Sequence, residues 1–450
     1  MKVKVMLSAA LLAAPAVLVV CPPVLAAQQA QKAQPAGDEG ARAISLDEAV
    51  KLAQQNAPQA IQARNTLRTS SASVRSAISA YIPTLTANAS GSRSSGETYF
   101  QGTLVPLKGD PWSYSRGFSS NLELFDGMRR WNNYRAAQSS VNAADVGEIA
   151  QRFNVALSVK QQYFAVLAAR ESEAAGRRQL EQAMQQLTVS SAKVTAGAAT
   201  RSDSLRAAIL VTNARLAILT AQNNLRVANA GLTRLVASPT VVTALVADTS
   251  EMGRIELDSS SLARLAIDGP VVRQASASLL LSHAAARASK STYMPVISAN
   301  FTYNGNNSSN KFTFAGGPAA DQTNFRLNLS YPLFNGYQRE AGVVNALAAE
   351  DNAEATLRDA RFAQQQSLVQ FLGAFRLAEQ RVALQLATIA AADEDLRVQQ
   401  QRYNLGASTL LDVLTSQSTL DAARAALIQA RFDARTAKAQ IEALVGRDLK

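Results

Sequence analysis

Apolar and polar residues alternate along four short stretches of the chain. In residues 84–90 and 297–303 every second residue is apolar, and the residues between them are Thr, Asn or Ser. Residues 118–124 and 325–331 largely repeat the pattern. A period of two predicts β-strands with one apolar and one polar face. We therefore expect two hairpins, at about 84–126 and 296–334, each joined by a loop rich in Gly, Ser and Asn, at 91–112 or 305–321.

Each predicted hairpin is followed by a helical segment of unusual length. Residues about 128–195 and 337–403 lack proline, contain few glycines and are rich in Ala, Gln, Leu, Arg and Glu. At 1.5 Å per residue, each helix would approach about 100 Å. A glycine ends each one, and return helices are expected at about 201–236 and 410–445. A plain long coiled coil would explain these helices but not the hairpins.

Short motifs occur twice, in the same order and at an offset of 209 or 212 residues. A period this long is not that of a solenoid. We interpret the chain as two copies of one unit, at 45–237 and 261–446, with a linker at 238–260 and a tail at 447–450. Two helices precede the hairpin in the first unit and one helix does so in the second. The paired motifs are Tyr81-Ile82-Pro83 with Tyr293-Met294-Pro295, Leu124-Phe125-Asp126-Gly127 with Leu333-Phe334-Asn335-Gly336, Gly197 to Asp203 with Gly406 to Asp412, and Leu235-Val236-Ala237 with Leu444-Val445-Gly446.

The N-terminus has the features of an export signal. A basic start precedes an apolar run that is short for a membrane helix, and small residues near Ala26 suit signal peptidase. We expect a signal peptide at 1–26 and a flexible leader at 27–44. The residues on either side of Cys21 suit a lipid-modification site poorly.

Composition excludes several classes of chemistry. Cys21 is the only cysteine and His283 the only histidine, so the mature chain has no thiol nucleophile, His-based triad or Cys/His metal site. The formal charge of +11 falls to +9 without Lys2 and Lys4. Basic residues are scattered among Gln, Ala and Glu without interleaved aromatics, which indicates solvated helix faces. We expect no enzyme activity, cofactor, metal or nucleic-acid partner.

Entry of this exported chain into a membrane would use the strands. We identify no segment after the signal that is apolar for the ~20 residues a membrane helix needs. Four strands cannot close, and an open sheet edge in lipid leaves unpaired backbone groups. Two copies would give eight strands with little interior space, whereas three would give twelve and a wider lumen. The same threefold symmetry would also close the Ala-rich helices of three copies into a tube.

The duplicated motifs resemble those of the TolC-type outer membrane efflux proteins. The resemblance runs from Leu46-Asp47-Glu48-Ala49 to Ala443-Leu444-Val445-Gly446, and is most specific around Leu333 to Gly336 and Arg402 to Leu414. It implies a mixed α and β membrane fold: a homotrimer with a twelve-stranded barrel in the Gram-negative outer membrane and a long periplasmic α-helical barrel. Residues 46–56 and 239–268 would lie around the middle of that tunnel.

The same resemblance implies a passive exit duct of a tripartite efflux or type I secretion system. Such a duct has no energy source of its own, so its partners would be a periplasmic adaptor (membrane fusion protein) and an inner-membrane RND or ABC pump. A non-transporting periplasmic coiled-coil or adaptor protein is the alternative. Adaptors have one helical hairpin and would not need strand alternation in two separated hairpins.

Acidic residues near the two helical tips are candidates for a periplasmic entrance. Asp203 and Asp412 lie six residues after Gly197 and Gly406. Threefold symmetry would turn each into a ring of carboxylates, which favours cations at a constriction. Alternatively, both are helix N-terminal acids that interact with the helix dipole. Both interpretations stay open at this point.

Further entrance residues follow from the resemblance. Tyr403 and Asp203 match a tyrosine and an aspartate that help to hold the closed entrance together in related proteins. The arginine of that tie falls on Ser408, and an acidic ring of some relatives falls on Thr415, which is uncharged. We therefore expect closure to be weaker here or to be built differently.

Two more sets of residues are expected to face a partner or the transported substrate. Small residues at the tips suit packing against an adaptor hairpin: Gly197, Ala198, Ala199, Gly406, Ala407 and Ser408. The barrel lumen is expected to be polar, through Asn88, Asn300 and Asn328.

Overall fold

The computed structural model describes residues 41–93, 96–106, 112–245, 259–309 and 320–449. The expected signal peptide, most of the expected leader and much of the linker at 238–260 lie outside these residues. The account below concerns the part of the chain that begins at Ala41.

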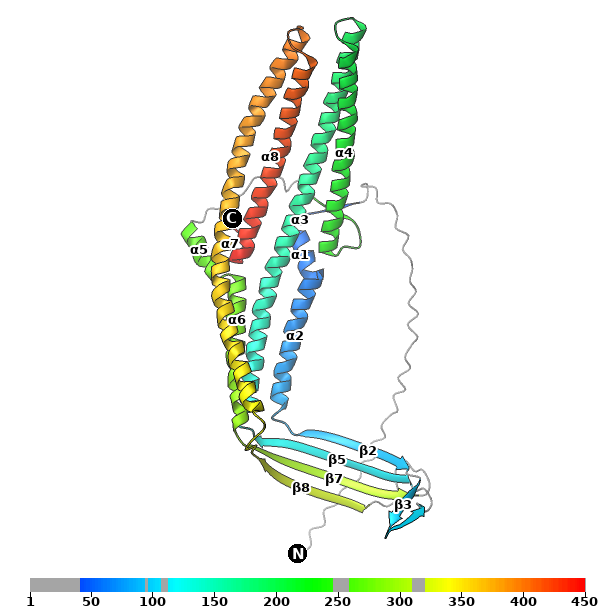
Figure 1. Cartoon of the computed structure of the whole chain (residues 1–450), viewed down its shortest axis with the longest axis vertical. Coiled ribbons are helices and arrows are strands. Elements are labelled where there is room, and N and C mark those ends of the chain that lie inside the picture. Colours follow the sequence, from blue (N-terminus) through cyan, green and yellow to red (C-terminus); the bar gives the residue numbers. More distant parts are fainter. Residues whose placement is uncertain (1–40, 94–95, 107–111, 246–258, 310–319, 450) are drawn as a thin grey trace. The chain divides into compact units, whose positions relative to one another are not determined.

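Eight α-helices account for most of the described chain (Figure 1). The long helices α3 (Arg129–Thr195) and α7 (Gln338–Asn404) both contain 67 residues, and the return helices α4 (Arg201–Val236) and α8 (Leu410–Val445) both contain 36. The absence of proline and the high content of Ala, Gln and Leu allow helices of this length. The shorter helices are α1 (Leu46–Asn56), α2 (Pro58–Ser79), α5 (Ser259–Ile267) and α6 (Pro270–Lys290).

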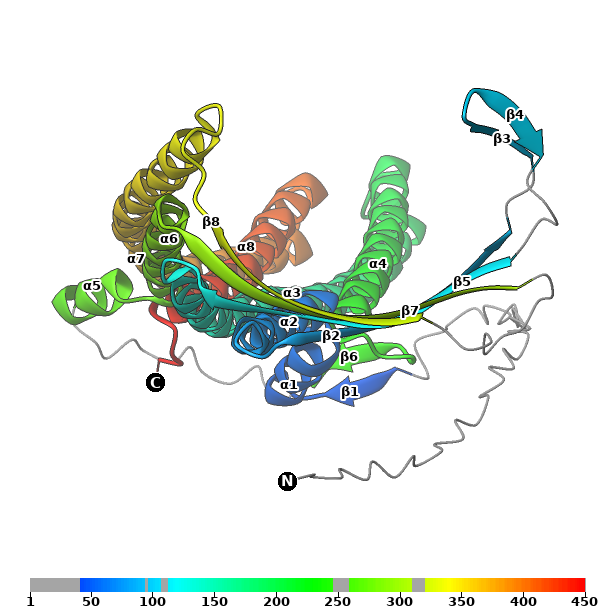
Figure 2. The ribbon, with the colours of Figure 1, turned by 90° about the horizontal axis from the view of Figure 1, so that it is seen from below.

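Four strands, two from each unit, form one antiparallel sheet in the order β2-β5-β7-β8. They are β2 (Thr84–Arg93), β5 (Trp112–Phe125), β7 (Val296–Ser309) and β8 (Ala320–Ser330). The pairing of β5 with β7 joins the two units. Figure 2 shows the four strands as one curved layer.

The first predicted loop is partly a strand pair, which corrects the expectation of irregular structure at 91–112. β3 (Glu97–Phe100) and β4 (Thr103–Pro106) pair as a small hairpin beyond the end of β2 (Figure 2). Gln101 and Gly102 connect them with φ values of 48° and 81°. Positive φ at both central residues is what a type I′ hairpin turn requires, and Gln-Gly is a weaker sequence signal for it than Asn-Gly.

Part of the predicted flexible leader and linker is also ordered. β1 (Arg42–Ile44) pairs in parallel with β6 (Val242–Ala244), and both pack near the buried Tyr163 of α3. The Tyr163 hydroxyl donates to the Ile44 carbonyl at 3.0 Å and accepts from the Leu245 N–H at 3.0 Å. This cluster is the largest core among the described residues, because α1, α3 and α4 also contribute to it.

The helices pack side by side as a wall with two different edges. Toward the tips, neighbouring helices follow in the order α4, α3, α8 and α7; toward the sheet the order is α2, α3, α6 and α7 (Figure 1). One edge therefore consists of α4, α2 and β2, and the other of α7 and β8.

Candidate functional site

Both helical hairpins turn in the same way at their tips. Gly197 and Gly406 have φ values of 74° and 75°, and an added Cβ would meet no atom within 4 Å at either position. The left-handed backbone, not crowding, therefore favours glycine here. The Ala198 N–H donates to the Lys193 carbonyl and the Ala407 N–H to the Arg402 carbonyl, each at 2.8 Å. These are the bonds of a Schellman motif, which ends α3 and α7.

Asp203 and Asp412 cap the return helices. The Asp203 carboxylate accepts from the Thr200 N–H at 3.0 Å and the Thr200 hydroxyl at 2.8 Å. Asp412 accepts the same two bonds from Thr409, both at 2.8 Å. Hydrogen bonds from Thr409 lower the pKa of Asp412, so this exposed carboxyl is charged at neutral pH. The role as helix N-terminal acids is thus observed, whereas rings of carboxylates require further copies of the chain.

Tyr403 contacts Lys193 of the other hairpin. The Lys193 ammonium lies 3.7 Å from the centre of the Tyr403 ring and donates to the Tyr403 carbonyl at 3.0 Å. The Tyr403 hydroxyl is buried and has no hydrogen-bond partner among the described residues. In the single chain Asp203 is bonded within its own turn, and the Tyr403 hydroxyl makes no hydrogen bond to it.

The remaining tip residues are bonded to their own hairpin or face solvent. The Ser408 hydroxyl donates to the Gln399 carbonyl at 3.4 Å, and the Thr415 hydroxyl to the Leu411 carbonyl at 2.9 Å. Ala198 and Ala407 are exposed, and Ala199 is half-buried. Small, accessible side chains therefore surround both tip turns.

A polar groove of about 400 Å³ lies below the tips between the two hairpins. Gln179 of α3 donates to the Asp421 carboxylate of α8 at 3.0 Å. Gln417 of α8 donates to Gln182 of α3 and to Asp421, each at 3.0 Å. Burial raises the pKa of Asp421 despite these bonds. We did not predict this group, because glutamine is too common along all the long helices for any one to be singled out.

The sheet has one continuous polar face. In an antiparallel pair, directly opposite residues share a face. Asn300 is opposite both Asn121 and Arg326, Asn328 is opposite Ser298, and Asn88 is opposite Gly117, which is itself opposite Asn304. Asn88, Asn300 and Asn328 therefore lie on the same face, together with Thr, Ser, Gln and Glu side chains. Leu, Ala, Phe and Tyr dominate the opposite face.

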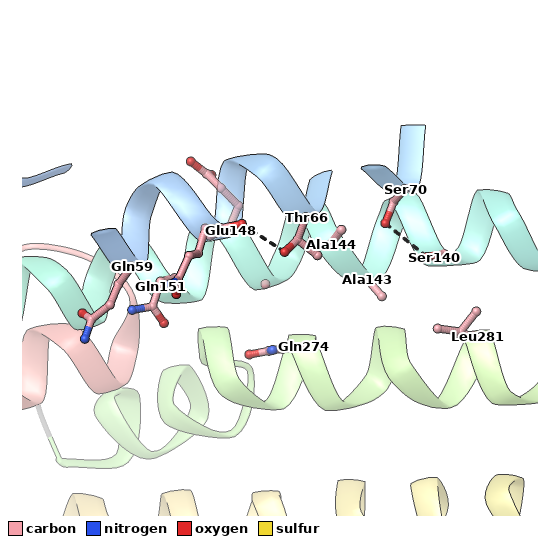
Figure 3. Close-up of a pocket in the computed structure, with 13 residues that line it drawn as sticks. Gln59, Thr66, Ser70, Ser140, Ala143, Ala144, Glu148, Gln151, Gln274 and Leu281 are labelled. Carbon is pink, nitrogen blue, oxygen red and sulfur yellow. Dashed lines mark hydrogen bonds between the residues drawn. The ribbon is translucent and has the colours of Figure 1, made fainter. Parts of the chain in front are cut away.

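A second groove, of about 590 Å³, lies between α2, α3 and α6 (Figure 3). Its walls carry mainly Gln, Ser, Thr and Ala, and Ser70 is hydrogen-bonded to Ser140 at 3.3 Å. Its acidic side chain, Glu148, forms an ion pair with Arg152 at 3.3 Å. Among the described residues no group of three or more His, Cys, Asp or Glu could hold a metal ion.

Helix α4 contradicts the expectation that no segment after the signal is apolar enough to cross a membrane. By length and composition α4 qualifies, but few of its residues in the qualifying window are buried. It begins with a capping box and packs along α3. The exposed apolar side chains of α4 lie along one stripe at the edge of the wall. Composition alone is weak evidence for a membrane span.

Comparison with known proteins agrees with this architecture. The sequence profile of the family "Outer membrane efflux protein" matches residues 49–238 and 264–447, one match for each unit. Protein CyaE of Bordetella pertussis is 25% identical over 395 residues, covering 85% of this chain and 79% of CyaE. The pyoverdine export outer membrane protein OpmQ of Pseudomonas aeruginosa is 24% identical over 337 residues, covering 74% of this chain and 69% of OpmQ.

Solved structures show the same fold. The MtrE outer membrane channel of Neisseria gonorrhoeae, in its open state, superposes with a TM-score of 0.71 at 21% identity, covering 90% of this chain and 89% of MtrE. The outer membrane protein VceC of Vibrio cholerae superposes with a TM-score of 0.71 at 17% identity, covering 90% of this chain and 97% of VceC.

The duplicated wall of long helices on an antiparallel sheet thus defines a TolC-like channel protein of the Gram-negative outer membrane. The chain belongs to the outer membrane efflux protein family. It is the outer membrane efflux channel of a tripartite efflux or type I secretion system and not an enzyme. The predicted family and fold class are confirmed, and the alternative of a non-transporting coiled-coil or adaptor is wrong.

Proposed function

We propose that three copies of this chain close head to tail into one passive duct, whose entrance is formed by the helical tips. The observation that carries the proposal is that, among the described residues, the wall has one unpaired edge on each side at the level of the tips and of the sheet. Because the edges differ, one edge of a copy pairs with the opposite edge of the next, and a head-to-tail contact of this kind gives a ring where the rotation closes.

Apolar stripes on both helical edges support this assembly. On α4, large apolar side chains recur at helical spacing on one face and are exposed in the single chain: Leu205, Ile209, Leu216, Leu219 and Val227. The other edge, α7, exposes Val344, Phe362, Val369 and Leu384 in the same way. Exposed large apolar side chains aligned on one face of a helix favour an interaction site.

The sheet supports the same arrangement. β2 and β8 each have a strand neighbour on one side only among the described residues. In lipid, the free edges would leave N–H and C=O groups without partners, so they require each other across copies. Three copies bring twelve strands together, with the polar face that contains Asn88, Asn300 and Asn328 toward the lumen and the apolar face toward lipid.

The tips are proposed as both entrance and docking surface. Asp203 and Asp412 would present threefold rings of charge while capping their helices, and Tyr403, Ser408 and Thr415 would lie beside them. Exposed Ala198 and Ala407, with Ala199, Gly197 and Gly406, leave space for close approach of helices from a periplasmic adaptor. The adaptor connects the duct to an inner-membrane RND or ABC pump, because the channel itself has no energy source.

Edge variants test the assembly. Leu216 on α4 and Phe362 on α7 are each 64% exposed in the single chain. We expect Leu216→Glu or Phe362→Glu to abolish the trimer, because three charges would be buried at the closed contacts. Leu405→Glu is the matched control, since this leucine is 85% exposed at a tip turn; it should leave the trimer intact.

Native mass spectrometry of the detergent-purified protein gives the stoichiometry. Conductance in planar bilayers shows whether the purified oligomer forms a pore. A monomeric wild type, a different copy number, or edge variants that assemble like the wild type would overturn the proposed closure.

A further inference from the structure

We propose that Lys193 holds the two helical tips of one protomer together and thereby keeps the entrance closed. This inference rests on the proposed location of the entrance. It assigns to Lys193 the contact that holds the tips together, for which related proteins use an arginine at the position of Ser408. Lys193 lies in the last turn of α3, in the first hairpin, and Tyr403 lies in the last turn of α7, in the second. The contact therefore spans the two units.

Three features make the ammonium group suitable for this position. Its nitrogen lies 3.7 Å from the Tyr403 ring centre, within the range of a cation–π interaction. It donates to the Tyr403 carbonyl at 3.0 Å and lies 3.4 Å from the Asn404 side-chain oxygen. These acceptors belong to the C-terminal end of α7, where the helix dipole attracts a positive charge. A neutral side chain of the same length would lose all three interactions.

The contact is also isolated at the tip. Side-chain hydrogen bonds between α3 and α8 lie further from the tips, where Gln179 and Gln182 meet Asp421 and Gln417. The polar groove extends from these residues to Tyr403 and Asn404, which Lys193 contacts. Release of Lys193 would therefore let the tips separate while the lower hydrogen bonds still hold the hairpins together.

The geometry gives a specific prediction for Tyr403. Lys193 contacts the face of the ring and the backbone carbonyl, and the hydroxyl has no partner among the described residues. Tyr403→Phe keeps the ring and the carbonyl, so it should retain the tie. Tyr403→Leu removes the ring and should weaken it.

Single-channel recording of the purified oligomer in planar bilayers tests the proposal. We expect Lys193→Met to raise the occupancy of the high-conductance state by about tenfold, the effect of losing a cation–π contact and a charged hydrogen bond. Lys193→Arg and Tyr403→Phe should resemble the wild type. Combining Lys193→Met with Tyr403→Leu should add little to either single change, because both remove one interaction. Arg201→Met is the control, since it removes a charge from an exposed side chain at the same tip.

The outcomes separate this inference from the proposed function. Wild-type pores of low conductance, with Lys193→Met indistinguishable from them, would overturn the tie and leave the duct standing. An equal rise for Arg201→Met would also overturn it, because the effect would then be one of general charge. A wild type that forms no pore would overturn both proposals. Native mass spectrometry of each variant confirms that the oligomer is intact.

Discussion

The two repeat units share the same local structure but differ in what surrounds them. α3 and α7 have the same length, α4 and α8 have the same length, and both return helices begin with a Thr–Asp capping box. The residue before each long helix, Met128 or Tyr337, has positive φ directly after a glycine that also does. The motifs that the duplication preserved are therefore the ones that start and end helices.

The strand–helix junctions show how surroundings change the same motif. In the first unit the buried Asp126 accepts from the Arg130 N–H at 2.9 Å and from its guanidinium at 3.1 Å. In the second unit the equivalent amide oxygen of Asn335 and the Nε of Arg339 are buried without hydrogen-bond partners among the described residues. The first junction lies inside the wall and the second at its edge, so position in the wall decides which contacts complete the motif.

The junction glycines give the largest expected difference between the units. Gly127 and Gly336 have φ values of 66° and 68°, so alanine would be strained at both. A Cβ at Gly127 would also lie 2.2 Å from the Met294 Cβ, whereas none would meet anything within 4 Å at Gly336. We expect Gly127→Ala to cost about 3 kcal/mol and Gly336→Ala about 1 kcal/mol. Thermal unfolding followed by the helical circular dichroism signal measures both.

Equal losses for these two variants would contradict the difference in surroundings. They would show that the edge junction becomes as crowded as the interior one once the copies assemble.

Substitution of Lys160 gives the next largest expected difference in unfolding free energy. The ion pairs of Lys160 have no counterpart in the other unit. Its ammonium group lies 2.6 Å from Glu442 and 2.9 Å from Asp448, while the equivalent position in the second unit is the exposed Val369. Lys160→Met would leave the buried Glu442 carboxylate unpaired, at a cost of about 2 kcal/mol. Thermal unfolding followed by the helical circular dichroism signal measures this loss against the wild type.

The pH dependence of that loss has a definite sign. Burial alone would lower the pKa of Lys160, but the hydrogen bonds and charges of Glu442 and Asp448 raise it overall. A raised pKa means that the stabilisation is fully present below the ordinary lysine value of about 10.4 and is lost as the pH rises through the higher folded value. The difference in unfolding between wild type and Lys160→Met should therefore shrink in strongly alkaline solution, where the lysine charge is lost. A difference that stays the same throughout strongly alkaline solution would contradict the ion pair.

The capping boxes give the smallest effect and test how far the units are equivalent. Thr200→Ala and Thr409→Ala should each cost about 1 kcal/mol, because each removes the same cap. Thermal unfolding of the two variants should agree. A clearly larger loss at one tip would show that its cap has additional contacts in the assembly.

Much of the fold could be predicted because its signals are local. Alternation indicated the strands, proline-free segments indicated the long helices, and the glycines at 197 and 406 indicated the turns. The confirmed fold class followed from the duplication of these signals. The roles of Asp203, Asp412 and Tyr403 at an entrance stay predictions, since they depend on contacts between copies.

What could not be predicted depends on neighbours distant in the sequence. The β3–β4 hairpin turns at Gln-Gly, and β1 pairs with β6 across about two hundred residues. Lys193 sits in an ordinary basic last turn of α3 and gains its partner only when α7 lies beside it. The apolar composition of α4 likewise has no explanation until the helix is placed at an edge.

The two unlike edges of the wall have a genetic consequence. In the proposed ring each copy presents one edge to each neighbour, so a copy damaged on α4 alone still binds correctly through α7. Such a copy would enter mixed assemblies and leave them open. Substitutions confined to one edge are therefore expected to act dominantly when produced together with the wild type, whereas a chain damaged on both edges would be excluded and recessive.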